Sequence, residues 1–225
     1  MGQAKLKQSA TAKLLAEFPW CAICGGIKQA STREHMPPKA LFDNSHRPDR
    51  LVFPACHDCN KGTSTSDLVA SMISRWGMNV SPQSHVDHSK LSTQIKRQAP
   101  DVVQEWLSMD EPSKQALARQ HLDNHGVPVP AGAMMVTIGP LTIRQLNIFA
   151  HKTTVALHFQ HFQKPLPVDG RVHAIWRTKE DFALGVPQEL IDLLPGYPRA
   201  LDPMICGAPT SRASSSSAMG GTVTR

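Results

Sequence analysis

The fold of this 225-residue chain is decided by residues 20–26 (WCAICGG) and residues 54–60 (PACHDCN). Each stretch holds two cysteines separated by two residues, and 31 residues lie between the two pairs. A two-residue spacer lets one tight turn offer two thiolates to the same ion, and four thiolates bind zinc tetrahedrally. The spacing therefore predicts a structural zinc site. Its four predicted ligands are Cys21, Cys24, Cys56 and Cys59.

Three polar residues accompany the cysteines and are the candidate chemical groups of this region. Glu34 and His35 lie between the cysteine pairs, just before Pro37-Pro38, and Asn60 directly follows the second pair. An adjacent Glu and His are usually an ordinary surface pair, and an Asn at such a place can simply cap a helix. Their position within a zinc-held region favours a functional interpretation over this simpler one.

Short strands and a helix are expected around these residues. Residues 32–35 read as an extended segment that two prolines end, and residues 51–53 (LVF) read as a strand leading into the second cysteine pair. Residues 60–66 are polar, and Ser66 is the expected N-cap of a helix that ends at Gly77. The sequence thus predicts a small module that combines strands and a helix.

At these residues the chain resembles the HNH endonuclease family, in the branch that carries four zinc-binding cysteines. The resemblance covers residues 18–77 and rests on the order and spacing of several elements. These are the two cysteine pairs, the acid-His pair before a proline-rich loop, and the Asn after the second pair. The resemblance implies a ββα-metal fold, in which a short hairpin packs against a helix and a divalent cation lies at their junction.

The resemblance also implies a role for each of the three polar residues. His35 would be the general base that takes a proton from the water attacking a phosphodiester, and histidine suits this role because its ordinary pKa is about 6.5. Glu34 would bind a catalytic Mg²⁺ or Mn²⁺ ion. Asn60 would be a second catalytic residue that offers its carbonyl oxygen to the same ion, since such hard cations prefer oxygen ligands.

One position departs from the family's pattern. The family usually carries an Asn just before the strand that enters the second cysteine pair, and this chain has Arg50 there. An arginine cannot accept a hydrogen bond as an Asn carbonyl does, so Asn44 or Asp43 in the preceding loop is the alternative. Arg50 is instead a candidate phosphate contact. The other candidate nucleic-acid contacts, each weighed against ordinary solvated charge, are Arg33, Lys39 and Lys61.

The charge of the chain favours a polyanionic partner. The formal net charge is +6, and residues 1–80 carry ten Lys and Arg against six Asp and Glu, whereas residues 81–205 carry twelve of each. A basic module attracts nucleic acid, although an excess of this size also fits ordinary solubilising charge. We expect nucleic acid as the partner, in the form of double-stranded DNA.

The rest of the chain is expected to be mostly helical. Helices are predicted over residues 5–18, 91–107 with a break at Pro100, 111–125 and 141–162, and short strands over residues 134–138 and 171–178. The predicted architecture is α+β: a zinc-stapled nuclease-like module in residues 1–80, a mostly helical accessory domain with a few short strands in residues 81–205, and a disordered tail in residues 206–225.

The location and the oligomeric state are less well indicated. No apolar run is long enough to span a membrane, and the first residues lack the apolar core of a secretion signal, which predicts a cytoplasmic protein. In that reducing compartment the cysteine pairs are expected to bind metal rather than form disulfides, and Cys206 reads as a free thiol. The sequence leaves the oligomeric state open.

Two rivals to a DNA-cutting endonuclease stay open on the sequence alone. The first is a non-catalytic zinc-ribbon module that binds nucleic acid, which the departure at Arg50 favours and the presence of Glu34, His35 and Asn60 opposes. The second is a protein-interaction module that uses zinc only as a staple, which fits the modest charge excess.

Overall fold

A two-stranded antiparallel hairpin lies at the centre of the predicted module. Its strands are β1 (Thr32–Met36) and β2 (Leu51–Ala55), and Glu34 pairs with Phe53 in their register. β1 ends directly before the two prolines, as predicted, because proline restricts the residue before it and lacks a backbone donor. The computed structural model describes residues 2–42, 51–76, 82–129, 133–174 and 176.

Helix α2 (His57–Ile73) begins immediately after β2. The prediction that Ser66 caps this helix was wrong, because Cys56 is its N-cap and accepts a hydrogen bond on its sulfur from the backbone N–H of Cys59. Ser66 is instead buried in the middle of α2, where its hydroxyl donates to the carbonyl of Thr63 at 2.6 Å. Of the second cysteine pair, Cys56 is thus the N-cap of α2 and Cys59 lies in its first turn.

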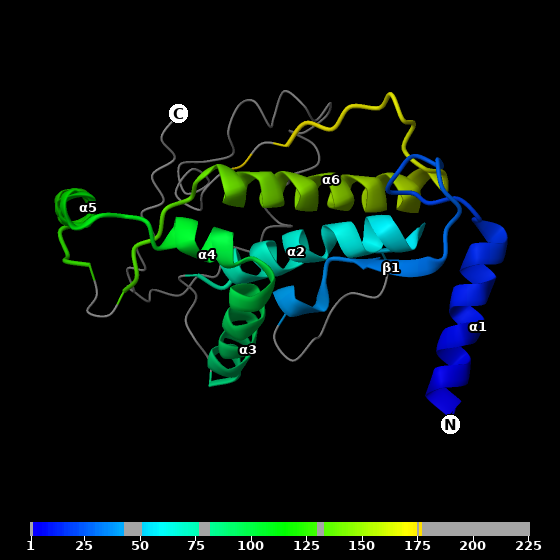
Figure 1. The fold of residues 1–225 in the computed structure, drawn as a ribbon, viewed down its shortest axis with the longest axis horizontal. Coiled ribbons are helices and arrows are strands. Elements are labelled where there is room, and N and C mark those ends of the chain that lie inside the picture. The colour runs from blue at the N-terminus through cyan, green and yellow to red at the C-terminus, as the bar shows by residue number, and fades with distance from the viewer. Residues whose placement is uncertain (1, 43–50, 77–81, 130–132, 175, 177–225) are drawn as a thin grey trace, which may run out of the picture. The chain divides into compact units, whose positions relative to one another are not determined.

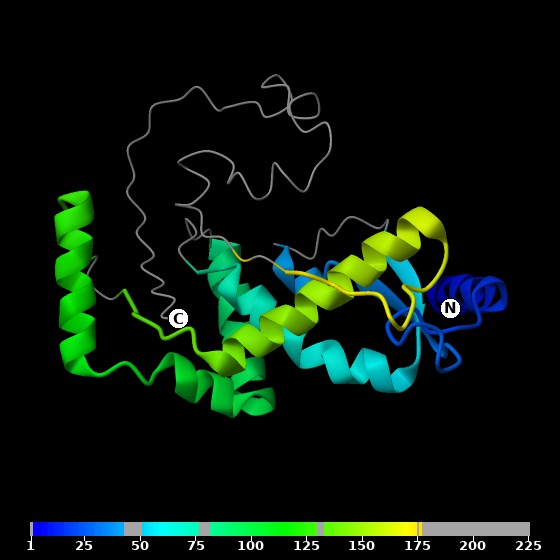
Figure 2. The ribbon, with the colours of Figure 1, turned by 90° about the horizontal axis from the view of Figure 1, so that it is seen from above.

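Helix α6 (Pro140–Phe162) packs against both α2 and the hairpin (Figures 1 and 2). Its bounds confirm the helix predicted over residues 141–162. A hydrophobic core joins α6 to the hairpin and to the first cysteine pair, and each of its members is at most 2% exposed. These residues are Ala22, Met36, Phe53, Val155, Ala156 and Phe159.

A second hydrophobic core lies between α2 and the next two helices, α3 (Pro82–Gln98) and α4 (Pro100–Trp106). The break before Pro100 confirms the interruption expected there, since a proline is tolerated only at a helix start. The buried residues of this core are Val69, Met72, Leu91, Ile95, Ala99, Val102 and Trp106.

The remaining elements are two helices and one short turn of 3-10 helix. Helix α1 (Gly2–Glu17) ends before Pro19, and η1 (Lys39–Leu41) follows the two prolines. Helix α5 (Glu111–His125) starts at Asp110, whose carboxylate accepts from the Ser113 N–H at 2.9 Å, and ends at Gly126 in the left-handed conformation. The end of α1 before Pro19 and both ends of α5 are those that the sequence predicts, whereas α1 begins at Gly2 and not at residue 5, and η1 was not predicted.

The short strands expected in the second part of the chain are absent from its described residues, which leave out residues 175, 177 and 178 of the second predicted strand. Residues 133–139 form no strand, although the Thr137 N–H donates to the Trp106 carbonyl at 3.1 Å, and residues 171–174 form none either. The architecture is therefore α+β through the hairpin alone, within the described residues. The predicted tail, residues 206–225, lies outside them, and the boundaries at residues 80 and 205 stay predictions.

A remote carboxylate holds the start of α6. Glu105, at the end of α4, accepts hydrogen bonds from the backbone N–H groups of Leu141 and Thr142, both at 2.8 Å. The Thr142 hydroxyl also donates to Glu105 and accepts from Trp106 Nε1 at 2.8 Å. A negative charge at a helix N-terminus meets unpaired donors and the positive end of the helix dipole. Burial raises the pKa of Glu105, but these hydrogen bonds outweigh it and bring the pKa below the usual 4.5.

Replacing Glu105 with Gln is expected to destabilise the protein by about 1–3 kcal/mol at pH 7, because hydrogen bonds to a charged acceptor are lost. The pKa of Glu105 is lower in the folded state than its usual value of 4.5. The contribution of Glu105 to the free energy of unfolding is therefore fully present above pH 4.5 and is lost as the pH falls through the lower pKa of the folded state. Urea unfolding of both proteins at pH 7 and pH 3 measures this. The matched control is Glu111→Gln, whose exposed pair with Lys114 contributes little. A stability difference between wild type and Glu105→Gln that does not shrink at pH 3 would contradict the expectation.

Candidate metal centre and active site

The two cysteine pairs form one four-thiol cluster. The Sγ atoms of its four members all lie within 4.8 Å of one another. The first pair comes from the turn before β1 and the second from the junction of β2 and α2. This distance and ligand type could hold a metal ion such as zinc. Its members are Cys21, Cys24, Cys56 and Cys59.

The turn that holds the first pair depends on two glycines and on a bond to β2. Gly25 and Gly26 have φ of 64° and 85°, a backbone conformation that side chains disfavour. The Gly26 N–H donates to the Cys21 carbonyl at 2.8 Å, which closes the turn around the two thiols. The Ala22 N–H donates to the Pro54 carbonyl at 2.9 Å and so fastens the turn to β2.

The four thiols do not ionise independently: burial opposes ionisation of Cys56, but hydrogen bonds involving Cys59 and Cys21 outweigh it and lower the pKa of Cys56. Burial, together with the neighbouring cysteines, raises the pKa of Cys59 well above its usual range, and burial also raises the pKa of Cys21. Thiolates packed this closely repel one another. A bound cation would offset that repulsion, because the thiolate is the form that binds metal.

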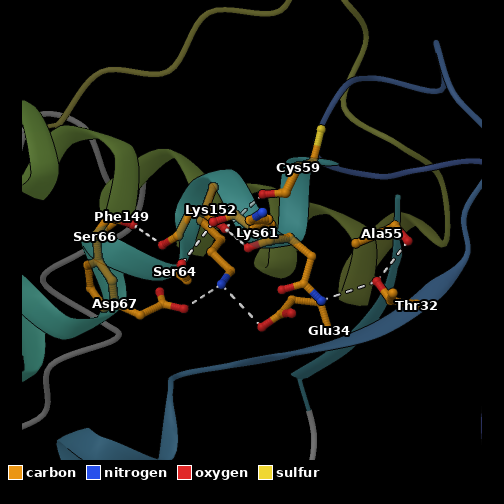
Figure 3. A network of polar contacts seen from close by, with 12 residues as sticks. Thr32, Glu34, Ala55, Cys59, Lys61, Ser64, Ser66, Asp67, Phe149 and Lys152 are labelled. Atoms are coloured by element: carbon orange, nitrogen blue, oxygen red, sulfur yellow. Dashed lines mark hydrogen bonds and ion pairs between the residues drawn. The ribbon is translucent and has the colours of Figure 1, made fainter. Parts of the chain in front are cut away.

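A buried lysine lies at the predicted site beside Glu34. The ammonium group of Lys152, from α6, lies 3.1 Å from Glu34 Oε1 and 2.6 Å from Asp67 Oδ2 (Figure 3). The Lys152 side chain is fully buried, whereas those of Glu34 and Asp67 are 14% and 18% exposed. The ammonium group of Lys152 therefore connects α6 to β1 through Glu34 and to α2 through Asp67.

Asp67 carries an unmet acceptor in this cluster. Burial raises the pKa of Asp67, although the charge of Lys152 opposes the shift. Its Oδ1 atom is buried and accepts no hydrogen bond from the described residues. The cluster of two carboxylates and one ammonium thus has a net charge of −1 when both acids are ionised.

Asn60 lies in the first turns of α2, on the same side of the hairpin as Glu34. Its Nδ2 donates to Thr32 Oγ1 at 3.2 Å, and the Thr32 hydroxyl donates to the Ala55 carbonyl at 2.9 Å. Thr32 and Glu34 are two residues apart in a strand and so share a face. The bond to Thr32 uses the amide nitrogen of Asn60 and not its carbonyl oxygen, which is the atom that a cation would bind.

His35 and Arg33 lie on the other face of β1, because neighbouring residues of a strand alternate between faces. Both are half-buried, and the Nδ1 atom of His35 is shielded from solvent. The structure thus brings Glu34 and Asn60 to one side of the hairpin and places the imidazole of His35 on the opposite side. The role of His35 as a base stays a prediction.

Two of the predicted nucleic-acid contacts lie on the surface. Lys39 lies on η1 and Lys61 on α2, and both are exposed, as phosphate contacts would need to be. His57, also on α2, has a side chain that is 73% exposed. The departing residue Arg50 and its alternatives Asp43 and Asn44 lie outside the described residues.

The sequence reasoning missed Lys152 and Asp67 as neighbours of Glu34. A signal for Lys152 was present, because it lies three residues after Phe149 and four before Ala156, on the stripe of α6 that also carries Phe159. A charge on an apolar stripe indicates a buried partner. Nothing in the sequence identifies that partner, since Asp67 lies 85 residues before Lys152 and Glu34 lies still further away in the chain.

Two further findings bear on the class of protein. No helix of the described part of the chain has both the length and the apolar character needed to cross a membrane. Comparison of the chain with protein-family models, with curated proteins and with solved structures finds no match. What the site defines by itself is a four-cysteine candidate metal centre beside a polar, partly buried hairpin face.

Proposed function

We propose that this protein is an HNH-type endonuclease that hydrolyses phosphodiester bonds in double-stranded DNA. The observation that carries the proposal is that Asn60, in the first turn of α2, lies on the same side of the hairpin as Glu34, next to the four-cysteine cluster. A hairpin followed by a helix is the ββα arrangement expected for the family. In this proposal the cluster holds a structural zinc ion, and residues 18–77 form the ββα-metal module.

The donor atoms beside the hairpin fit a hard divalent cation. Glu34 binds Lys152 through Oε1, so its second carboxylate oxygen is a candidate ligand, and Asn60 offers a carbonyl oxygen. Mg²⁺ and Mn²⁺ prefer such oxygen ligands. When bound, the cation supplies neutralising charge to the scissile phosphate and the leaving oxygen.

In the proposed reaction His35 takes the proton from the attacking water. This role rests on the resemblance: His35 directly follows the acidic ligand Glu34 in β1, and its side chain points to the other face of the strand. A neutral imidazole offers one unprotonated ring nitrogen that can accept this proton. Arg33 lies on the same face of β1 as His35 and is a candidate phosphate contact beside the base, with Lys39 and Lys61 as further contacts.

A second candidate function is a non-catalytic zinc-ribbon that binds nucleic acid. The observation that favours it is the ion pair between Glu34 and Lys152, because a carboxylate that already pairs with an ammonium can be purely structural. This rival predicts DNA binding without cleavage, so one assay separates the two.

Replacing His35 with Ala is expected to lower the rate of plasmid nicking by about 10²- to 10⁴-fold, which is what a general base contributes. The measurement is the conversion of supercoiled plasmid to open circles with Mg²⁺ or Mn²⁺, beside an RNA substrate and a DNA-binding assay. His57→Ala is the matched control, because His57 is an exposed histidine of the same module. Nicking by His35→Ala at the wild-type rate, or binding without nicking by the wild type across both cations, would contradict the nuclease proposal.

A further inference from the structure

We infer that Lys152 is a positioning residue of this site. Helix α6 would then belong to the active site together with the hairpin and α2. This inference rests on the proposed nuclease function. The side chain of Lys152 is fully buried, and its ammonium bonds Glu34 on one side and Asp67 on the other. Figure 3 shows the ammonium between the two carboxylates. The three residues come from β1, α2 and α6.

Stability alone does not account for a lysine at this place. Lys152 lies on the apolar stripe of α6, between Phe149 and Ala156, which both pack against the hydrophobic core of the hairpin. Taking a charge out of water is costly, and a buried ion pair is often no more stabilising than well-packed apolar residues of similar volume. An apolar side chain would therefore fill the position at least as well, unless the orientation of the carboxylates matters.

The geometry identifies what Lys152 does and what it cannot do. Because its ammonium is fully buried, it cannot contact a phosphate, so it is not a DNA-binding lysine. By bonding Oε1, it fixes the rotation of the Glu34 carboxylate and leaves the second oxygen for the cation. Asp67 anchors the ammonium from the far side at 2.6 Å. Groups that hold a metal ligand in place typically change metal affinity or activity by about 10- to 100-fold.

The test compares Lys152→Met, which keeps the length of the side chain and removes its charge, with Lys152→Arg, which keeps the charge. Lys164→Met is the matched control, because Lys164 is an exposed lysine just after α6. Three quantities are measured: Mn²⁺ binding without DNA by electron paramagnetic resonance, DNA affinity, and the kcat and KM of plasmid nicking. Thermal unfolding reports whether each variant is folded.

We expect Lys152→Met to bind Mn²⁺ more weakly and to lose kcat, each by about 10- to 100-fold, with KM and DNA affinity unchanged. Lys152→Arg should recover part of both losses, and Lys164→Met should match the wild type. If Lys152→Met does not fold, Asp67→Asn/Lys152→Met replaces it, because this pair keeps the net charge of the cluster at −1. The same losses are expected there.

Wild-type Mn²⁺ binding and kcat in folded Lys152→Met, or in the double variant, would overturn the inference. Tighter Mn²⁺ binding would also overturn it, because the ammonium would then be a competitor of the cation for the two carboxylates. Both results leave the nuclease proposal intact, since the wild type still binds Mn²⁺ and cuts. A wild-type protein that neither binds Mn²⁺ nor cuts overturns the proposed function and this inference together.

Discussion

Replacing Cys56 with Ser is expected to abolish metal binding at the four-thiol cluster, which could hold zinc, and to unfold the junction of the hairpin with α2. Cys56 has three functions in the structure: it is a member of the four-thiol cluster, the N-cap of α2, and a residue only 5% exposed that packs against Cys21 and Ala55. Apparent binding free energies of structural zinc are about 10–16 kcal/mol in zinc-finger peptides. Losing one ligand should therefore cost several kcal/mol.

Replacement by serine distinguishes the loss of a metal ligand from the loss of the helix N-cap. Serine is a better N-cap than most residues, and a lost cap costs only about 0.5–2 kcal/mol. The substitution thus keeps the cap and removes the thiolate, so a large loss of stability must come from the metal. The measurements are the zinc content of the purified protein and its thermal unfolding with and without a chelator.

A fifth cysteine of the chain provides the control for this experiment. Cys206 lies outside the described residues and belongs to neither cysteine pair of the sequence, so Cys206→Ser is expected to keep the zinc and the melting temperature of the wild type. Cys56→Ser with full zinc content and an unchanged melting temperature would show that the cluster is not a metal site. A chelator that leaves the wild-type melting curve unchanged would contradict the prediction in the same way.

Local signals in the sequence predicted much of the fold. The prolines after β1, Asp110 and Gly126 around α5, and the break before Pro100 all act through their own backbone or through neighbours within one helical turn. The four-cysteine cluster was also predictable, because its spacing encodes two tight turns even though the pairs are far apart in the chain.

The errors arose where the outcome depends on residues far apart in the chain. Ser66 and the following Asp67 look like the start of a helix, but α2 begins earlier, at the second cysteine pair. At roughly 3.6 residues per turn, this is about two and a half turns before Ser66. Residues 134–138 have a strand pattern without a partner strand, and the structure gives them no sheet to join. The cluster around Lys152 could not be predicted for the same reason, because the two carboxylates that pair with Lys152 lie on other elements of the fold.

A fragment that ends at residue 80, the predicted edge of the nuclease-like module, is expected to lose its cooperative fold. In the complete chain Met36 and Phe53 are covered by Val155, Ala156 and Phe159 of α6. The α2 side of the fragment loses its cover as well, because it packs against the apolar residues of α3 and α4. Exposing a buried Met, Phe or Val costs about 1.5–3 kcal/mol each.

Electrostatics add to this loss. Without α6 the carboxylates of Glu34 and Asp67 lose the ammonium that pairs with both of them, so nothing offsets the repulsion between the two charges. Whole domains are stable by only about 5–15 kcal/mol, so the combined loss is comparable to the entire stability of the module. Zinc bound to the four thiols would then hold a local turn, not a packed hairpin.

Comparison with a longer fragment makes the experiment decisive. A fragment of residues 1–172 keeps α6 and the compact unit to which it belongs, so it should unfold cooperatively near the melting temperature of the full chain. The 1–80 fragment should bind zinc but show poor dispersion in an amide correlation spectrum and no cooperative thermal transition. A 1–80 fragment that melts cooperatively within a few degrees of the longer one would mean that α6 covers the hairpin without stabilising it. The proposed active site would then fold without α6, and Lys152 would act only on the orientation of Glu34.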